Sequence, residues 1–519
     1  MANRNLFANA GAAMPAADTR NLAGGRAYAM TPKAALAQMA VTGVFNDTFY
    51  SDASSQLNAA KQLVSQVDST FLAKLAVYAR QNAYMKDMPA YLAAVLASKD
   101  VSMLARIFDR VVDNGKMLRN FVQMVRSGET GRRSLGTRPK KLVGTWLNAA
   151  NDAQLLAASV GTSPSLGEVI RLAHPAAASE QRDAFFKYIL GREHNVEALP
   201  SIVQDLEAFR ARRLSDVPKV PFELLTSMEL SPADWKGIAM NATWTQTRMN
   251  LNTFLRHGVF ESQQMVDVVA ARLRDAGQIA RANVFPYQLL AAYMNVSEAM
   301  PRKVVNALQD AMEIAVSNVP AFDVDVAVCV DTSQSMTQSV TGERKGATSK
   351  VRCIDVAALV ASAILRKNPD AEIVPFDTRV RELDLNGRDA IMTNAEKLAS
   401  LKGGGTDCSC ALAKLNEKGS RAQLVIYASD NESWVDRKSR YVANATSMMD
   451  EWKIYKRRNP NAKLVCIDVV PNATSQAKDH RDVLNVGGFS DTVFNTIALF
   501  AENKLTPQHW VGEIEKVIV

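Results

Sequence analysis

The sequence has few cysteines and no long apolar stretch. Its 519 residues include five cysteines, namely Cys329, Cys353, Cys408, Cys410 and Cys466. Because their number is odd and their spacing irregular, they do not indicate a disulfide framework, and we expect a reducing compartment, the cytoplasm. No run of 18 or more apolar residues occurs, so no transmembrane helix is expected. The N-terminus lacks the continuous apolar core of a signal peptide.

Histidine is also scarce, with five in the chain. No Ser-His-Asp, Cys-His or paired-carboxylate set occurs at usable spacing, so we expect a binding protein and not an enzyme. The glycine run at 403–405 is not followed by the Lys-Ser or Lys-Thr of a phosphate-binding loop. Cys408 and Cys410 lack a second cysteine pair at zinc-site spacing, and we interpret them as small buried residues.

The charge balance favours a polyanionic partner. The net charge is +8 and the isoelectric point is about 9.1. An excess of cations attracts nucleic acid, although this excess is modest over so long a chain. The hydrophobic fraction of 47% and the charged fraction of 22% are ordinary for globular proteins. The length exceeds what one core supports, so two or three domains are expected.

The first three fifths of the chain indicate helices. Residues 1–31 are rich in Ala, Asn and Gly without periodicity, and we expect an extended N-terminal segment. From 32 to 318 apolar positions recur at helical spacing, as at Phe71, Leu75 and Tyr78. Short helices joined by polar breaks over such a length favour a solenoid of stacked helix pairs. An irregular helical domain is the alternative, because no sharp repeat is evident.

The pattern changes at residue 319. Apolar, β-branched runs at 322–330, 371–376, 422–427 and 463–470 are typical of buried strands in a parallel sheet. Helical segments at 350–366, 395–401 and 443–457 lie between them. Strands that alternate with helices predict a doubly wound α/β domain over residues 319–519. Ligands of such folds bind beyond the carboxyl ends of the strands.

Polar side chains follow these strands in a pattern that suits a metal ion. Asp331, Ser333 and Ser335 form a D-x-S-x-S loop after the first strand, Thr406 follows the glycine run, and Asp430 follows the third strand. Because these loops emerge at one edge of the sheet, we expect their oxygens to converge. Hard oxygen ligands suit Mg²⁺ or Mn²⁺. The alternative is that Asp331 and Ser333 only cap the next helix.

A basic segment interrupts the helical half. Between residues 126 and 146 cations outnumber the single acid Glu129, and clustered cations can neutralise several phosphates. An arginine and a histidine follow near a helix end. The candidate RNA-contacting residues are Arg132, Arg133, Arg138, Lys140, Lys141, Arg171 and His174. Residues 244–250 combine Trp244 with amide and guanidinium groups that suit unpaired bases. The alternatives are solvated helix faces for the clusters and a core position for Trp244.

The metal pattern resembles the metal-ion-dependent adhesion site of von Willebrand A domains. The serine loop, the threonine and the second aspartate occur in that family's order, each after a predicted strand or in a glycine-rich turn. The resemblance implies that Ser333, Ser335 and Thr406 contact the cation, while Asp331 and Asp430 act directly or through water. In that family a partner's carboxylate often completes the shell.

The helical half resembles the TROVE module of Ro proteins. The motifs that carry the resemblance are residues 21–25 followed by Tyr28, then 46–50, 136–141 leading into 146–148, and 171–175. A TROVE module followed by a von Willebrand A domain is the architecture of the Ro ribonucleoprotein family, so the resemblance covers nearly the whole chain. It implies a HEAT-like helical-repeat ring, monomeric, with a positive central hole.

The resemblance also implies a function. Ro proteins bind small noncoding Y RNAs on the outer surface and take single-stranded ends of misfolded RNAs into the hole. Bacterial relatives are associated with RNA processing and decay, including a partnership with polynucleotide phosphorylase. The first hypothesis is therefore an RNA-binding scaffold. A metal-dependent protein-interaction module without RNA is the second, and metal-assisted hydrolysis is the third.

Overall fold

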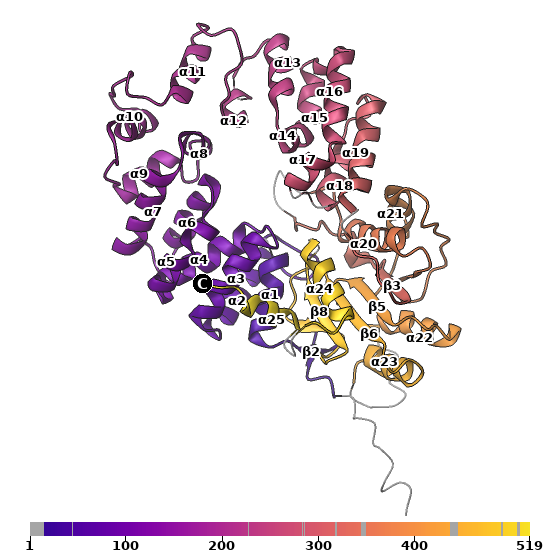
Figure 1. Cartoon of the computed structure of the whole chain (residues 1–519). Coiled ribbons are helices and arrows are strands. Elements are labelled where there is room, and N and C mark those ends of the chain that lie inside the picture. The colour runs from indigo at the N-terminus through magenta and orange to yellow at the C-terminus, as the bar shows by residue number, and fades with distance from the viewer. Residues whose placement is uncertain are drawn as a thin grey trace, which may run out of the picture. The chain divides into compact units, whose positions relative to one another are not determined.

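The computed structural model describes residues 15–43, 45–226, 228–282, 284, 286–316, 319–343, 349–435, 445–488, 491–505 and 509–519. The chain divides into two compact units, whose elements are drawn in Figure 1. The sheet unit comprises residues up to Leu63 together with Val319–Glu513, and the helical unit comprises Val64–Asn318 together with Ile514–Val519. Each unit is described separately below.

The helical unit begins with a regular stack of helices. They are α3 (Ser69–Gln81), α4 (Asp87–Lys99), α5 (Val101–Val111), α6 (Gly115–Arg126), α7 (Thr137–Ala149), α8 (Asp152–Ala158) and α9 (Leu166–Ala173). From α3 to α7 each helix packs against the next but one along the chain, α3 on α5 and so on to α7 on α9. This pattern confirms the predicted stacking for the first half of the unit.

The second half of the helical unit has shorter and less regular helices. They are α10 (Glu180–Ile189), α11 (Ser201–Arg210), α12 (Phe222–Leu225), α13 (Pro232–Asn241), α14 (Trp244–Met249), α15 (Leu251–Arg256), the 3₁₀ turn η1 (Val259–Glu261), α16 (Gln263–Leu273), α17 (Ala276–Arg281), α18 (Pro286–Asn295) and α19 (Arg302–Ala315). Here α16 packs on α13, α14 and α19. Among the residues described in either unit, no helix is long and apolar enough to span a membrane.

Polar residues at the helix starts explain why the breaks occur where they do. The carboxylates of Asp68 and Asp100 and the side-chain carbonyl of Asn114 each accept a backbone N–H three residues ahead, at 2.8–3.0 Å. Ser165 and Glu168 cap α9 reciprocally. Such caps satisfy backbone donors that would otherwise lack a partner. The chain can therefore end one helix and start the next within a few residues.

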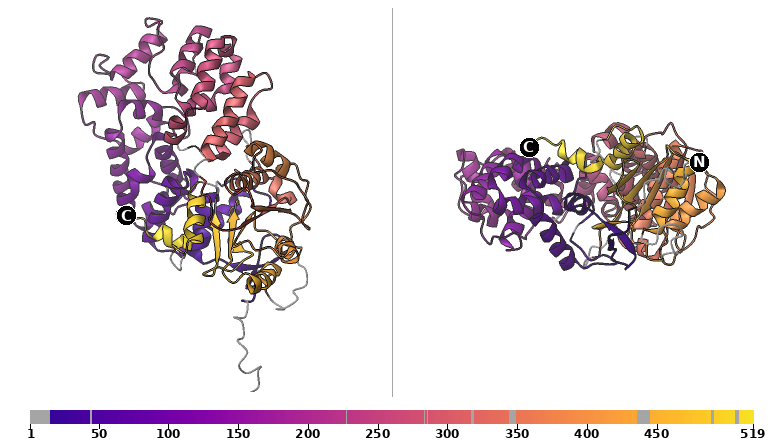
Figure 2. Two further views of the ribbon diagram at one scale, coloured as in Figure 1. Left: turned by 45° about the vertical axis from the view of Figure 1, so that its right-hand side comes forward. Right: turned by 90° about the horizontal axis from the view of Figure 1, so that it is seen from below.

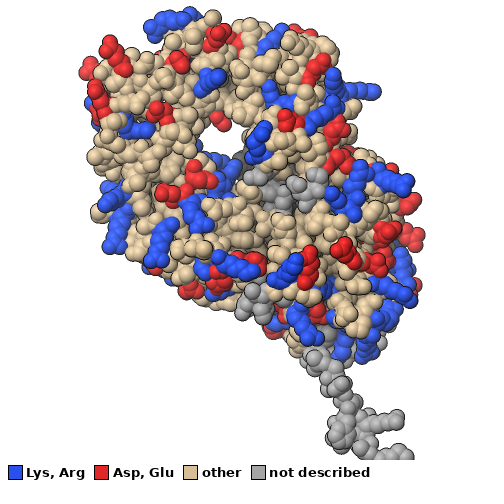
Figure 3. All heavy atoms as spheres, viewed as in Figure 1, with Lys and Arg blue, Asp and Glu red and all other residues tan. Residues whose placement is uncertain are grey.

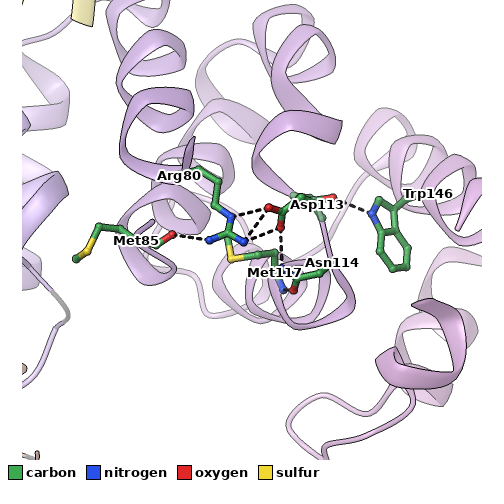
Figure 4. Close-up of polar contacts among 7 residues, drawn as sticks. Arg80, Met85, Asp113, Asn114, Met117 and Trp146 are labelled. Carbon is green, nitrogen blue, oxygen red and sulfur yellow. Dashed lines mark hydrogen bonds and ion pairs between the residues drawn. The ribbon is translucent and has the colours of Figure 1, made fainter. Parts of the chain in front are cut away.

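A polar network fixes α7 against its predecessors (Figure 4). Arg80 at the end of α3 donates two hydrogen bonds of 3.0 and 2.9 Å to the carboxylate of Asp113, and a third of 3.2 Å to the Met85 carbonyl. One residue earlier, the carbonyl of Val112 accepts a 2.7 Å bond from Trp146 Nε1 of α7. Trp146 is buried, so this bond anchors the middle of α7 to the turn between α5 and α6.

The sheet unit contains five parallel strands. They are β3 (Val326–Asp331), β4 (Glu372–Phe376), β5 (Leu424–Ser429), β6 (Lys463–Asp468) and β8 (Val483–Gly487), in the order β4-β3-β5-β6-β8. The four predicted strands are confirmed, with somewhat different bounds. β8 was not predicted. Its five residues are all buried, but the run is short and adjoins a glycine pair.

Helices cover both faces of this sheet (Figures 1 and 2). The helical elements that begin in this unit after β3 are the 3₁₀ turn η3 (Gln334–Thr337), α20 (Cys353–Lys367), α21 (Ile391–Ala399), α22 (Ser409–Lys418), α23 (Ser447–Arg458), α24 (Asp491–Ala501) and α25 (His509–Glu515). On one face Tyr427 and Cys466 pack with Leu415, Trp452 and Tyr455 of α22 and α23. α20 packs against β3 and β5. The doubly wound α/β domain is thereby confirmed, and all five cysteines are buried, as expected for Cys408 and Cys410.

The N-terminal residues up to Leu63 belong to the sheet unit, which differs from the boundary predicted at 31, whereas the boundary predicted at 318 coincides with the division between Asn318 and Val319. Strands β1 (Thr19–Arg20) and β2 (Arg26–Ala29) form a small antiparallel sheet with β7 (Thr474–Ser475). Helix α1 (Pro32–Thr42) packs on β8, and Gln38 donates to the carbonyls of Asp468 and Val470. Every residue of α1 from Ala35 onward is buried. A helix that is apolar on all sides requires such enclosure, so α1 is not the first solenoid helix.

Candidate functional site

The strand order places a crevice between β3 and β5. β3 connects to β4 on one side, and the chain then returns to β5 on the other side of β3. Such a reversal leaves an opening at the carboxyl ends of the two strands, where ligands of open α/β sheets bind. Asp331 is the last residue of β3, and Asp430 directly follows β5. Both carboxylates are fully buried.

Each carboxylate is held by neighbouring donors. Asp331 accepts the backbone N–H of Ser333 on Oδ1 at 2.9 Å and the hydroxyl of Ser429 on Oδ2 at 2.6 Å. Asp430 accepts the N–H of Glu432 on Oδ1 at 3.3 Å. Ser429 was not singled out from the sequence, although it directly precedes Asp430. Its hydroxyl ties the two strand ends together across the crevice.

The three predicted hydroxyls lie in the same buried loops. The Ser333 and Ser335 hydroxyl oxygens are 3.2 Å apart, and Thr406 is also buried. Ser333 is the N-cap of η3, but its side chain makes no cap bond, so capping does not explain its presence. Thr406 Oγ1 and Asp430 Oδ2 are buried without a hydrogen-bond partner among the described residues. Oxygens without partners beside paired carboxylates are what a divalent cation would satisfy.

The donor set fits Mg²⁺ or Mn²⁺ and does not fit zinc. Within the described part of the chain no group of three or more His, Cys, Asp or Glu residues could hold a metal. A cation here would therefore depend on hydroxyl oxygens as well as carboxylates. Magnesium and manganese accept such ligands, whereas zinc prefers sulfur and nitrogen.

Glycine allows the loop that carries Thr406 to approach the serine loop. A Cβ atom at Gly403 would lie 1.8 Å from the Thr332 carbonyl oxygen, while one at Gly404 would meet no atom within 4 Å. Gly404 accepts the N–H of Gln334 at 2.9 Å and donates its own N–H to Asp377 Oδ2 at 3.0 Å. Asp377, which follows β4 and was not singled out from the sequence, therefore positions the glycine loop.

The crevice concentrates negative charge. Burial raises the pKa of Asp331 to about 7, and the charge of Asp430 adds to the shift. Burial likewise raises the pKa of Asp430 and that of Glu432, the latter to about 8. A bound divalent cation would offset this repulsion and favour the ionised forms.

Two N-terminal segments pack around the crevice. The amide of Ala23 donates to Glu432 Oε2 at 2.9 Å, and Asn21 Nδ2 donates to the Ser433 carbonyl at 2.7 Å. Tyr50, from the segment that leads to α2 (Ala53–Ser65), lies against the Ser335 hydroxyl. Burial and the nearby carboxylates raise its pKa to about 12, so its phenol is neutral at physiological pH. The sequence motifs at 21–25 and 46–50 thus act in the sheet unit.

Large apolar side chains are exposed beside these segments. Leu22 is 58% exposed, Phe49 is 53% exposed and Trp434 is 50% exposed. Leu22 and Trp434 adjoin the residues joined by the Asn21–Ser433 bond, and Phe49 precedes Tyr50. Exposed apolar groups gathered near one polar site are typical of an interaction surface.

A second site lies in the helical unit, between α7 and α9. The groove has a volume of about 740 Å³, and its lining includes Lys140, Lys141 and His174 and no acidic residue. Over the face drawn in Figure 3, by contrast, cationic and acidic side chains are intermingled. A groove lined by two lysines and no acidic residue therefore differs from that mixture, although the net charge of the chain is modest.

Asn148 of α7 builds the floor of this basic groove. Its Nδ2 donates to the Ala176 carbonyl at 2.9 Å, and its Oδ1 accepts the Ala178 N–H at 3.0 Å. These bonds hold the loop after α9 against α7. His174 ends α9 in the left-handed conformation, with φ 48°, and its side chain is exposed. The imidazole is therefore presented at the groove and not packed into the core.

The remaining predicted cations divide by position. Arg138 and Arg171 are exposed on α7 and α9 but are not among the groove-lining residues. Arg132 donates to the Ala97 carbonyl at 2.6 Å, so its guanidinium supports the end of α4. Arg133 is exposed in the loop between α6 and α7. The structure thus brings together Lys140, Lys141 and His174, with Arg138 and Arg171 on the same two helices.

Two further arginines of the helical unit form ion pairs, and Trp244 lies in the core. Arg210 pairs with Glu207 at 2.6 Å, and Arg212 pairs with Asp234 at 3.3 Å. Trp244 is buried and donates from Nε1 to the Leu273 carbonyl at 3.1 Å. It is therefore a core aromatic and not a stacking platform, as the alternative interpretation expected.

Comparison with known proteins agrees with this geometry. Residues 326–501 match the family model described as the Ro60 vWA domain. The chain is 25% identical to the "RNA-binding protein RO60" of Deinococcus radiodurans over 94% of its own length and 96% of the relative. The chain therefore contains a von Willebrand A domain of the Ro60 type and is similar to a Ro protein over nearly its whole length. The predicted two-part architecture, a helical part followed by a von Willebrand A domain, is confirmed.

A solved structure supports the fold of the chain as a whole. The crystal structure of the Deinococcus radiodurans RO (RSR) protein matches with a TM-score of 0.63 and 21% sequence identity. The match covers 92% of this chain and 100% of the other. At that identity the likeness concerns the fold. The chemistry of the crevice and the groove depends on this chain's own residues.

Proposed function

We propose that this chain is a Ro protein and that it binds RNA through the basic groove between α7 and α9. The observation that carries the proposal is the groove itself, which presents Lys140, Lys141 and His174 without an acidic lining residue. Lysines neutralise phosphates and release counterions. The exposed imidazole can stack on an unpaired base or donate to a phosphate.

The beginning of α7 strengthens the attraction for phosphate. Its first turn contains Arg138 and no acidic residue, and the N-terminal end of a helix carries a partial positive charge. Arg171 adds a cation at the end of α9. A backbone that follows the groove would meet cations from both helices.

The RNA we propose is a small structured noncoding RNA of the Y type, together with single-stranded ends of misfolded RNA. The protein would act as a cytoplasmic scaffold in RNA processing, quality control or decay, without catalysis of its own. Polynucleotide phosphorylase is the partner enzyme we propose. The printed name of the Deinococcus relative, which describes an RNA-binding protein, supports RNA binding in general.

Fluorescence anisotropy with a labelled Y-like RNA tests this function. The triple charge reversal Arg138→Glu, Lys140→Glu and Lys141→Glu should weaken binding by at least about a hundredfold at moderate salt. A matched reversal of three exposed cations elsewhere in the helical unit, Lys116, Lys219 and Arg256, should have a much smaller effect. Equal losses in both variants would exclude the groove as the binding site.

We also propose that the crevice between β3 and β5 holds Mg²⁺ or Mn²⁺. Ser333, Ser335 and Thr406 would contact the cation, with Asp331 and Asp430 acting directly or through water. The cation supplies an electrophilic centre that attracts an anionic ligand. The buried, unpartnered oxygens of Thr406 and Asp430 support this assignment. Electron paramagnetic resonance of added Mn²⁺ should detect one site in the full-length protein and none in Asp331→Ala.

The exposed apolar residues beside the crevice favour a second role. Leu22, Phe49 and Trp434 would contact a protein whose carboxylate is drawn to the cation. Binding of polynucleotide phosphorylase should then require Mg²⁺, and it should fall about tenfold or more in Trp434→Ser. Mg²⁺-independent binding, or binding lost after ribonuclease treatment, would assign the contact to RNA.

A further inference from the structure

Tyr50 is delivered to the crevice by a segment that is clipped to the sheet unit. Asn46 Nδ2 donates to the Thr341 carbonyl at 2.7 Å, and the backbone of Asp47 exchanges hydrogen bonds with that of Glu343 at 2.7 and 3.3 Å. The Phe49 amide donates to Gln338 Oε1 at 2.7 Å. The segment thus runs beside the chain that leaves η3, with Tyr50 next to the last of these contacts.

The same segment is closed internally. Thr48 donates its N–H at 2.8 Å and its hydroxyl at 2.9 Å to the Ser51 carbonyl, and its hydroxyl oxygen accepts the Ser51 N–H at 3.2 Å. Gln56 of α2 donates to the Asn46 carbonyl at 2.7 Å. A turn supported on both sides holds its aromatic residues in place, and the rings of Phe49 and Tyr50 meet edge to face at 4.8 Å.

The place that Tyr50 occupies matters for ligands of the proposed cation. Its partly buried phenol lies against Ser335, near the carboxylates of Asp331, Asp430 and Glu432. A hydroxyl ligand has one proton and two lone pairs. A ligand that reaches the cation from the side of Ser335 would therefore compete with the Tyr50 hydroxyl for the space next to the serine.

We propose that Tyr50 determines which ligand the metal site accepts, because its phenol fills the approach over Ser335 and excludes an external carboxylate. This inference rests on the proposed metal site. A water molecule can reach the cation beside the phenol, whereas a carboxylate needs room for two oxygens and a substituent. The site takes an acidic partner only when Tyr50 has moved aside.

Movement of Tyr50 would be passed along the chain. Ala53, the first residue of α2, donates its N–H to Asp47 Oδ1 at 2.8 Å, within the segment that carries Tyr50. α2 ends at Ser65, beyond the point where the chain enters the helical unit. Exchange of Tyr50 for an external ligand therefore acts on the helix that links the two units.

The experiment uses full-length protein, Mn²⁺ as the metal and acetate as the carboxylate probe. Mn²⁺ affinity is measured by electron paramagnetic resonance, and acetate binding by the loss of water-proton relaxation as acetate displaces water from bound Mn²⁺. Tyr50→Phe removes only the hydroxyl, and Tyr50→Ala removes the ring as well. Tyr84→Phe, at an exposed tyrosine of the helical unit, is the matched control.

The expected result separates the two affinities. Mn²⁺ should bind all four proteins within about threefold, because the phenol is not a metal ligand. Acetate should bind to Tyr50→Phe about fivefold more tightly than to the wild type, the equivalent of one hydrogen bond. It should bind to Tyr50→Ala at least as tightly as to Tyr50→Phe. Tyr84→Phe should match the wild type.

Two results would overturn the inference. One is unchanged acetate affinity in both Tyr50 variants while Mn²⁺ still binds. The other is a loss of Mn²⁺ affinity of about tenfold or more in Tyr50→Phe, which would make Tyr50 a ligand of the metal. Failure of the metal site itself is distinguishable, since the wild-type protein would then not bind Mn²⁺ before any variant is compared.

Discussion

Neutralising the two lysines of the basic groove should change how RNA binding responds to salt. Lys140 and Lys141 both line the groove, and each can neutralise one phosphate. Loss of two phosphate contacts lowers the slope of log affinity against log salt by about 1.4 for single-stranded RNA and about 1.8 for a duplex. The advantage of the wild type over Lys140→Gln, Lys141→Gln should thus shrink about tenfold between 50 and 200 mM salt.

The assay is a salt series of anisotropy titrations with one labelled RNA. A matched double variant, Lys187→Gln with Lys303→Gln, removes the same formal charge from the helical unit. Both of its lysines are ion-paired, Lys187 with Asp183 at 2.7 Å and Lys303 with Asp267 at 2.9 Å. Its slope should stay close to that of the wild type. Equal slopes for the wild type and the groove variant would refute the reasoning. Equal losses of RNA affinity in the two double variants would show that the effect comes from net charge and not from the groove.

Three further predictions concern the framework of the two sites. Gly403→Ala would force a Cβ atom to 1.8 Å from a backbone oxygen, so Mn²⁺ affinity should fall at least about tenfold, whereas Gly404→Ala should change it less than about twofold. Asp331→Asn removes one of two buried like charges, so the melting temperature in EDTA should rise by about 2–4 °C while the stabilisation by Mg²⁺ is lost. Trp146→Phe leaves the Val112 carbonyl without its donor, and urea unfolding should show a loss of about 1–3 kcal/mol.

The sheet unit could be predicted in outline because its strands are buried on both faces. Such strands appear in the sequence as apolar runs, and the polar residue that ends each run marks the carboxyl edge. Asp331 and Asp430 were placed at one edge on that basis. α22 was not predicted, because it is short and begins directly after the glycine loop, where no helix start is marked by a side-chain cap.

The N-terminal boundary could not be predicted from periodicity. α1 has helical spacing like the helices after it, and nothing local shows that it packs on β8. The decisive contact joins Gln38 to the carbonyls of Asp468 and Val470, more than 400 residues away. Tertiary contacts at that separation leave no pattern in a single sequence.

The basic groove was predicted only as a set of cations. The sequence does not distinguish Arg132, whose guanidinium is used by the Ala97 carbonyl, from Lys140, which lines the groove. The difference depends on whether a helix end lies within reach. The floor made by Asn148 and the loop after α9 arises from packing between two helices, which composition does not reveal.

The proposed metal site is assembled from two stretches of the chain. The helical unit is inserted between Leu63 and Val319, so the sheet unit is built from chain on both sides of it. Ala23 and Tyr50 come from before the insertion, while Asp331 and Glu432 come from after it. In this proposal a ligand that displaces Tyr50 also acts on the start of α2, because Ala53 is hydrogen-bonded to Asp47 of the same segment. We therefore propose that occupancy of the metal site and binding of a carboxylate there are coupled to α2, the helix through which the chain enters the helical unit.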